Sequence, residues 1–214
     1  NRVDYYNAAS TRSITGGTLQ VGSGATATNF DFRIYGYTPS VVLDNTTNAK
    51  TLAMSTVYNY IGVYGSMTLN SGTTFTAVAN PGEVDILGGA LTISSGATFN
   101  LNAGVLFHAG TALVNNGTFN GSVAGSLLYW GGTVAQSISG TGTNTAALPT
   151  MSLDNAAGLT FDPAMNQFPV NRINLFTGGL TNANKLTLGN GGTTTGIIQI
   201  GNSGTATNAG SFDA

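Results

Sequence analysis

The sequence contains no cysteine and few charged residues, and each of these shortages excludes a class of protein. Without cysteine, neither a disulfide framework nor a thiolate metal site can form. Charged residues make up 7% of the chain, against about 25% in ordinary soluble domains. The six Lys and Arg residues are scattered and the net charge is −2, so the basic patch that nucleic-acid binding needs is missing. No apolar run approaches the roughly 18 residues of a membrane helix, and we expect no transmembrane segment.

Helix signals are missing as well. No window of about a dozen residues places apolar groups at the i, i+3, i+4 and i+7 positions of an amphipathic helix. Short alternations of apolar and polar residues, bounded by Gly, Asn, Ser or Thr, recur instead throughout the chain. With 41% hydrophobic residues and 31 glycines, the composition is not that of a disordered chain. It predicts an all-β protein with many tight corners and a polar, uncharged surface.

Two segments of the chain repeat each other, Gly65–Phe75 and Gly89–Phe99. Each has a short apolar–polar alternation, a Ser-Gly corner and a second strand that opens on Thr-Phe. Recurrence at a fixed step of 20 to 50 residues is typical of stacked architectures, in which no single unit buries its own apolar face. We therefore expect Leu69 to lie over Ile93 and Phe75 over Phe99 in inward-facing columns.

The glycine corners that follow have shorter spacings. Gly110, Gly117 and Gly125 lie seven and eight positions apart. Three sides of this length make a turn of roughly 22 residues, which is within the range of solenoid repeats. This arithmetic predicts a parallel β-solenoid (a β-helix), with roughly nine turns of about 20–25 residues for the 214-residue chain. The usual crossover preference makes it right-handed. An antiparallel β-sandwich array is the rival architecture, and it would show hairpin turns in place of stacked corners.

The domain organisation follows from this periodicity. Residues 1–12 carry little pattern and form a lead-in, whereas residues 13–214 form a single solenoid domain. Leu19–Gly24 is echoed by Ile198–Gly204, and Gly210–Ala214 has the character of a turn cut short. We expect the chain to be a segment of a longer repeat protein.

A family resemblance appears in the second half of the chain, in Gly132–Gly142, Leu153–Phe161 and Leu186–Gly189. The sequence of these segments resembles the repeat regions of very large adhesins of gliding bacteria, which the type IX secretion system exports. The resemblance implies an extracellular, cell-surface protein with a structural or adhesive role. It implies no enzymatic activity, no catalytic residue, no metal and no cofactor. The implied partners are neighbouring repeats, other surface proteins or glycans.

Acid–base chemistry has few candidates. His108 is the only histidine, and without a Gly-x-Ser-x-Gly elbow it is expected at a strand end, in a structural role. Glu83 and Asp85 lie two apart on a predicted strand and share a face. Paired carboxylates serve glycoside hydrolysis or Ca²⁺ binding, so a polysaccharide-active β-helix enzyme, a lyase or hydrolase, is an alternative function. The competing interpretation is a solvated strand face.

Tyrosines make the one constellation that suggests binding. The pair Tyr35 and Tyr37 is followed by the pair Tyr58 and Tyr60 at nearly the step of the repeat, and Tyr64 lies on the same strand face. If successive turns place these pairs on one side, they form an exposed ladder suited to stacking on sugars or anchoring a protein. Packing beneath a loop is the structural alternative.

Ice binding is a further alternative, since Thr-rich solenoid faces suit it. The pairs Thr68/Thr92 and Thr74/Thr98 supply two turns of matching threonines. The sequence spacing then predicts that the register is lost, which makes this function the less favoured one.

Overall fold

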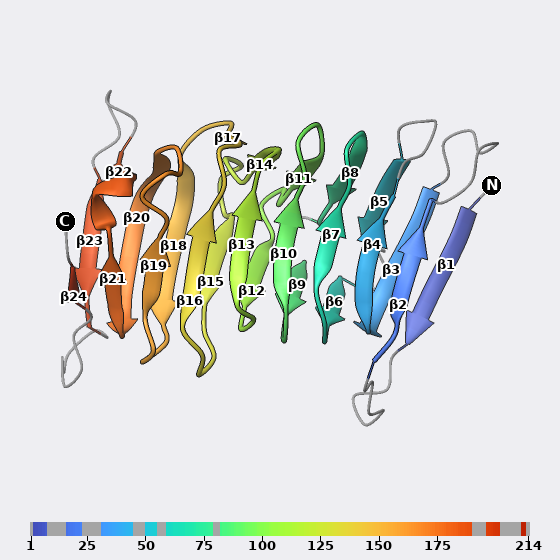
Figure 1. The fold of residues 1–214 in the computed structure, drawn as a ribbon, viewed down its shortest axis with the longest axis horizontal. Coiled ribbons are helices and arrows are strands. Elements are labelled where there is room, and N and C mark those ends of the chain that lie inside the picture. The colour runs from blue at the N-terminus through green and yellow to red at the C-terminus, as the bar shows by residue number, and fades with distance from the viewer. Residues whose placement is uncertain are drawn as a thin grey trace.

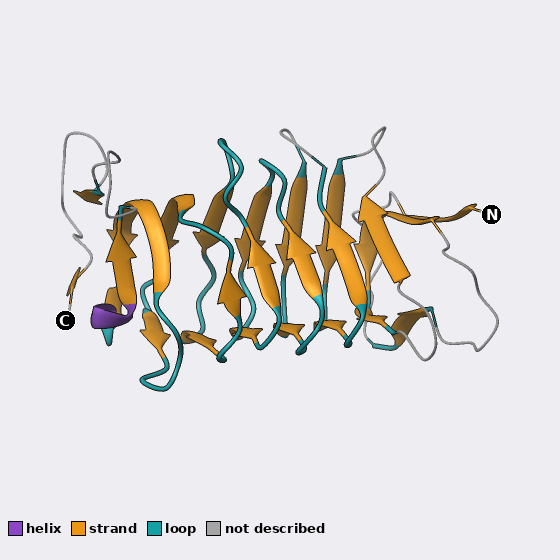
Figure 2. Cartoon of the chain, turned by 90° about the horizontal axis from the view of Figure 1, so that it is seen from above, coloured by secondary structure: helices purple, strands orange, loops and turns teal. Residues whose placement is uncertain are grey.

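The protein is a row of parallel strands that runs from one end of the molecule to the other (Figure 1). The computed structural model describes residues 2–7, 16–22, 31–44, 50–54, 59–78, 82–189, 196–201 and 211–212. The strands of these segments pair in parallel, and Figure 2 shows the turns stacked along the long axis. The predicted all-β parallel solenoid is confirmed, and the antiparallel alternative is wrong. The right-handed sense stays a prediction.

Each turn has three sides. The first side contains β1 (Arg2–Asn7), β3 (Asp31–Thr38), β6 (Tyr60–Val63), β9 (Glu83–Ile86), β12 (Val105–His108), β15 (Leu127–Trp130), β18 (Leu148–Asp154), β20 (Phe168–Thr177) and β23 (Ile197–Ile200). The second side contains β2 (Thr18–Val21), β4 (Ser40–Leu43), β7 (Met67–Leu69), β10 (Ala90–Ile93), β13 (Ala112–Asn115), β16 (Gln136–Ser139), β19 (Leu159–Phe161), β21 (Gly179–Thr181) and β24 (Ser211–Phe212). The third side contains β5 (Lys50–Met54), β8 (Thr73–Thr76), β11 (Thr98–Asn100), β14 (Thr118–Asn120), β17 (Thr143–Asn144) and β22 (Leu186–Leu188). A single turn of 3-10 helix, η1 (Ala183–Lys185), precedes β22.

The long strand β3 joins two sides. Its first half pairs with β5 on the third side, from Asp31 opposite Thr51 onward, and its second half pairs with β6, from Gly36 opposite Ile61 onward. The two sides therefore form one continuous sheet, whereas the nine strands of the second side form a separate sheet.

The solenoid has about six turns, so the expected count of about nine is too high. The described chain is nearly continuous from residue 59 to residue 189. Among the described residues, six strands lie on the third side, and only a turn with all three sides is complete. Division of the whole length by one repeat length assumed that every turn is complete.

The repeated segments of the sequence predicted the positions of the corners. Gly72 and Gly96 stand at equivalent corners with φ of 75° and 77°, a left-handed conformation that glycine adopts without a steric cost. The strands on either side alternate between buried and partly exposed residues. This alternation directs one set of side chains to the axis of the solenoid and the other set to the surface.

The core consists of stacked columns of apolar side chains. Leu69 lies opposite Ile93, and Phe75 opposite Phe99, as the repeats predicted. The rings of Phe75 and Phe99 stack with centroids 4.9 Å apart, and Phe99 stacks on Phe119 at 5.7 Å. Since burial of one such ring is worth about 1.5–3 kcal/mol, each turn is stabilised mainly by the turns on either side.

The expected lead-in, residues 1–12, contains β1, which pairs in parallel with β3. No described helix is long and apolar enough to cross a membrane.

Candidate functional site: a tyrosine–carboxylate cluster

The tyrosines and the carboxylate pair that the sequence singled out meet on the first side of the solenoid. Tyr37 of β3 lies opposite Gly62 of β6, which lies opposite Asp85 of β9. Tyr60 lies opposite Glu83 in the neighbouring column. We call Tyr37, Tyr60, Tyr64, Glu83 and Asp85 the tyrosine–carboxylate cluster.

Gly62 gives the cluster its shape. A Cβ atom at this position would lie 2.8 Å from Cδ1 of Tyr37 and 2.8 Å from the hydroxyl oxygen of Tyr60. Both tyrosines therefore extend across the bare backbone of β6, into space that a side chain would otherwise fill. A glycine inside a strand weakens it and commonly marks such a close approach.

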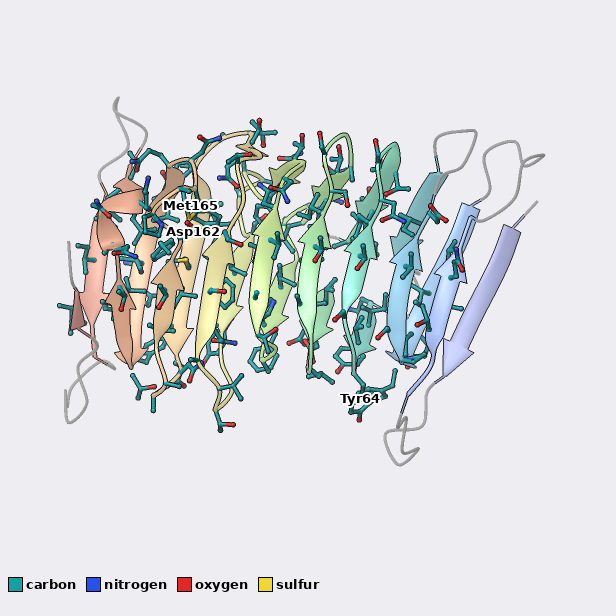
Figure 3. All side chains as sticks on the ribbon, in the orientation of Figure 1. Tyr64, Asp162 and Met165 are labelled. Atoms are coloured by element: carbon teal, nitrogen blue, oxygen red, sulfur yellow. The ribbon has the colours of Figure 1, made fainter. Side chains whose placement is uncertain are left out.

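The three tyrosine rings contact one another. The centroids of Tyr37 and Tyr60 are 5.4 Å apart in an edge-to-face arrangement, and those of Tyr37 and Tyr64 are 5.5 Å apart. Tyr64 is the most accessible ring, with 38% of its surface exposed, and it projects at the lower edge of the molecule in Figure 3. The cluster thus has a packed interior and one open aromatic edge.

The expected ladder of paired tyrosines is wrong in its register. Tyr37 faces Gly62 and not Tyr60, because the turn that joins the two strands is two positions longer than the spacing of the tyrosine pairs. The rings gather into a compact group in place of an exposed row. Tyr35 is half-buried on the same strand, whereas Tyr58 lies outside the described residues. The predicted binding role of Tyr35, Tyr37, Tyr58, Tyr60 and Tyr64 stays a prediction.

The carboxylate pair shares a face, as the spacing predicted, but it is not a solvated face. Only 8% of the Asp85 surface is exposed. Its Oδ2 accepts a 2.8 Å hydrogen bond from the Tyr60 hydroxyl, whereas its buried Oδ1 has no partner. The solvated interpretation is therefore wrong for Asp85, because the tyrosines cover it.

Burial raises the pKa of Asp85 from 3.8 to about 7. The hydrogen bond from Tyr60 acts in the opposite direction, and the charge of Glu83 raises this pKa further. Burial and the hydrogen bond to Asp85 also raise the pKa of Tyr60. Asp85 is thus a carboxyl group that gains or loses its proton near neutral pH.

Besides glycoside hydrolysis, the Glu83 and Asp85 pair was a candidate for Ca²⁺ binding. Among the described residues, no three His, Cys, Asp or Glu side chains come together in a way that would hold a metal ion. Asp162 lies far along the stack from Tyr64, between β19 and β20 (Figure 3).

His108 ends β12, as expected, and it is fully buried. Its Nε2–H donates to the carbonyl of Ala112 over 2.8 Å, and its ring packs against Trp130 with centroids 4.7 Å apart. Burial lowers its pKa to about 4. The imidazole is therefore neutral at physiological pH and covered from solvent, and its hydrogen bond supports the corner.

Sequence reasoning missed a second aromatic group on the same side. Tyr129 donates a 2.9 Å hydrogen bond to Asp154, 25 residues later, and its ring lies 5.5 Å from that of Phe107. Phe107, Tyr129 and Asp85 share one column. The available signal was the spacing of 25 residues, which also separates Tyr60 from Asp85.

Sequence reasoning also missed a buried amide pair at the adjoining corner. Gln136 donates to the carbonyls of His108 and Gly110 over 2.7 and 2.9 Å, and Asn155 donates to Oε1 of Gln136 over 2.8 Å. These bonds satisfy backbone groups that the corner would otherwise bury without partners. The pair holds three successive turns together.

Comparison with protein-family models, curated proteins and solved structures found no match to this chain.

Proposed function

We propose that this chain is a segment of an extracellular bacterial cell-surface protein, in which the solenoid is a stiff stalk that also carries an adhesive patch. The observation that carries this proposal is the repeated pairing of whole turns. Each central turn is joined to the next by three parallel strand pairs, for example β6 with β9, β7 with β10 and β8 with β11.

The geometry suits a load-bearing element. Hydrogen bonds between parallel strands run from turn to turn, along the axis of the stack. Tension along the axis would have to break the ladders on three sides at once before two turns separate. The stacked rings of Phe75, Phe99 and Phe119 would be exposed to water in the same step. Both contributions resist bending as well as extension.

The adhesive patch is the exposed edge of the tyrosine–carboxylate cluster. Tyr64 presents an accessible ring whose position is fixed by Tyr37, and this ring pair has little conformational entropy to lose on binding. Flat rings with a polar tip suit sugar faces and protein anchors. The patch is small, so strong attachment would depend on several copies acting together.

A binding assay on glycan arrays and intact bacterial surfaces tests the adhesive role. Tyr64→Ala removes the accessible ring, and Val134→Ala is the matched control because Val134 is an exposed apolar side chain, at 46%, outside the cluster. We expect saturable binding that Tyr64→Ala weakens at least tenfold and Val134→Ala leaves unchanged. Equal binding by all three chains would remove the cluster from the proposal, and absence of any binding would reduce the segment to a spacer.

A polysaccharide-active enzyme is the second candidate, and one observation favours it. The pKa of Asp85, about 7, is in the range that a general acid needs, and Glu83 lies beside it as a second carboxylate. Release of reducing or unsaturated sugar ends from a panel of polysaccharides, lost in both Glu83→Gln and Asp85→Asn, would establish this function in place of the stalk.

A further inference from the structure

The third side of the solenoid carries a column of aligned threonines. Four of them occupy equivalent positions on successive strands β8, β11, β14 and β17: Thr74, Thr98, Thr118 and Thr143. We call these four residues the hydroxyl column. The labels of the four strands follow one another along the upper edge of Figure 1.

The expectation that the threonine register is lost after two turns is therefore wrong on this side. The step from Thr98 to Thr118 is shorter than the step of the repeat and the step from Thr118 to Thr143 is longer, yet each pair faces directly across the sheet. The corners absorb the difference in length. A search at one constant step cannot detect this alignment in the sequence.

A second column of polar side chains runs beside the first, two residues further along each strand. Thr76, Asn100, Asn120 and Thr145 form it, and we call it the amide column. Asn100 donates to Thr76 over 3.2 Å, Asn120 donates to Asn100 over 3.1 Å, and Thr145 donates to Asn120 over 2.9 Å. These side chains hold one another in place.

The two columns differ in what their polar atoms contact. The amide column bonds to itself, whereas no hydroxyl of the hydroxyl column bonds to another described residue. Thr74, Thr98 and Thr118 are partly exposed and Thr143 is exposed. The positions of their hydroxyls are restricted because a β-branched side chain is stiff at χ1. Behind them, Phe75, Phe99 and Phe119 stack and fix the spacing of the strands.

The chemistry of this face excludes most partners. The eight side chains of the two columns carry no charge and no aromatic ring, so the face offers nothing to a charged polymer. It has no aromatic or Arg anchor of the kind that dominates protein interfaces. A sugar would exchange hydrogen bonds with water for hydrogen bonds with hydroxyls, and without a ring to stack on it would gain little.

A neutral lattice of hydroxyls and methyls fits a neutral lattice of water. Neighbouring strands place the hydroxyls about 4.7–4.9 Å apart, and the two columns lie about 6.6–6.8 Å apart along each strand. These repeats are comparable with the spacings of water oxygens on a prism face of hexagonal ice. Each contact is weak, but a rigid face loses almost no entropy when it forms many contacts at once.

We propose that the face formed by the hydroxyl and amide columns binds ice. The four free hydroxyls and their methyl groups hold water in positions that continue into the crystal, and the amide column keeps the neighbouring row in register. This proposal stands independently of the stalk role, since it concerns another side of the solenoid and needs no partner molecule.

Ice-affinity partitioning of the fluorescently labelled full chain tests the proposal, with inhibition of ice recrystallisation as the second measurement. Thr98→Tyr combined with Thr118→Tyr places two bulky rings in the hydroxyl column. Thr92→Tyr is the matched control, because Thr92 points outward from β10 on the second side. We expect the wild-type chain and Thr92→Tyr to enter the growing ice and the double variant to be excluded from it.

A second variant tests the proposal without introducing bulky side chains that could disturb the fold. Thr98→Val combined with Thr118→Val keeps the branched shape and removes only two hydroxyls, so the stack should remain folded. We expect its uptake into ice to fall several-fold. Exclusion of the wild-type chain from ice, or an equal loss of uptake in Thr92→Tyr, would overturn the proposal.

Discussion

The first side of the solenoid contains the same arrangement twice, and the two copies differ in burial. Tyr60 donates to Asp85 and Tyr129 donates to Asp154, in each case 25 residues later. Gly62 and Gly131 each follow the tyrosine by two residues, and each leaves room for an aromatic ring, that of Tyr37 or of Phe107. The two hydrogen bonds are nearly equal in length, but one carboxylate is buried and the other is exposed.

The difference lies in what stands beside the aspartate. Glu83 occupies the position opposite Tyr60, whereas Ser152 occupies the position opposite Tyr129. Asp85 is buried with one oxygen unpaired, while Asp154 is exposed and also accepts a 2.7 Å hydrogen bond from Thr177. A tyrosine hydrogen bond is common to both copies, so the raised pKa of Asp85 follows from its burial and from the charge of Glu83.

The largest expected effect concerns the dependence of stability on pH. A carboxyl with a raised pKa keeps its proton in the folded state while the unfolded chain has lost it. Its contribution is therefore complete below the unfolded pKa, 3.8, and is lost as pH rises towards the folded pKa, about 7. At about 1.4 kcal/mol per pKa unit, we expect the free energy of unfolding to fall by a few kcal/mol between pH 4 and pH 8.

The variant Asp85→Asn should remove most of this decline, because an amide keeps the shape of the side chain without the charge. We expect it to be more stable than the wild type at pH 8, by about 1–3 kcal/mol. Urea unfolding between pH 4 and pH 8 provides the measurement, and Asp154→Asn is the control that should keep the wild-type decline. Identical profiles for Asp85→Asn and the wild type would contradict the comparison.

The second effect concerns the two glycines. Gly62→Ala and Gly131→Ala would each introduce a Cβ atom within 3.0 Å of an aromatic side chain, and such overpacking costs about 1–3 kcal/mol. We expect both variants to unfold at lower urea concentration. Only Gly62→Ala should also change the pH profile, because it displaces the hydroxyl that contacts Asp85. A change of the pH profile in both variants, or in neither, would contradict the expectation that only Gly62 affects the protonation of a buried carboxyl.

A third test exchanges the residue that distinguishes the copies. Glu83→Ser places at the first copy the residue type that the second copy carries in the matching position, and it removes a charge that raises the pKa of Asp85. We expect this pKa to fall, as measured by NMR titration of the Asp85 carboxyl carbon. Burial remains, so the pKa should stay above 3.8. An unchanged pKa would mean that Glu83 has no part in the shift.

The last pair of variants removes the tyrosine hydroxyls, and it includes the smallest expected effect, that of Tyr129→Phe. Tyr60→Phe leaves a buried carboxylate oxygen without its donor and should cost about 1–3 kcal/mol at pH 8. Tyr129→Phe removes a bond to an exposed carboxylate and should cost at most about 1 kcal/mol. Ultraviolet titration of the wild type should find Tyr129 ionising near pH 12, because burial raises its pKa. Equal costs for the two variants would show that burial does not separate the copies.

The fold could be predicted because neighbouring segments of the sequence repeat each other at a constant spacing. The Ser-Gly corners at Gly72 and Gly96 and the columns Leu69/Ile93 and Phe75/Phe99 lie in turns of equal length. A constant step was sufficient there, and residue chemistry determined which side chains point inward.

The candidate site could be predicted only in part, because its contacts depend on turns of unequal length. The spacing of Glu83 and Asp85 showed that they share a face, but burial of Asp85 follows from tyrosines that cross over Gly62. The threonine register failed for the same reason, since a shorter step and a longer step both return the chain to the same position. The lengths of the corners determine which residues of successive turns align, and composition does not reveal these lengths.

The stacking of similar turns also has a consequence for folding. Side-chain hydrogen bonds between turns join residues about one turn apart in sequence, such as 20 for Asn120 with Asn100 and 25 for Tyr60 with Asp85. The loop that must close to add a turn is thus about the same size everywhere in the stack, and its entropic cost does not grow with the number of turns already formed. A longer relative of this solenoid would fold by repeating one elementary step, each finished turn serving as the template for the next.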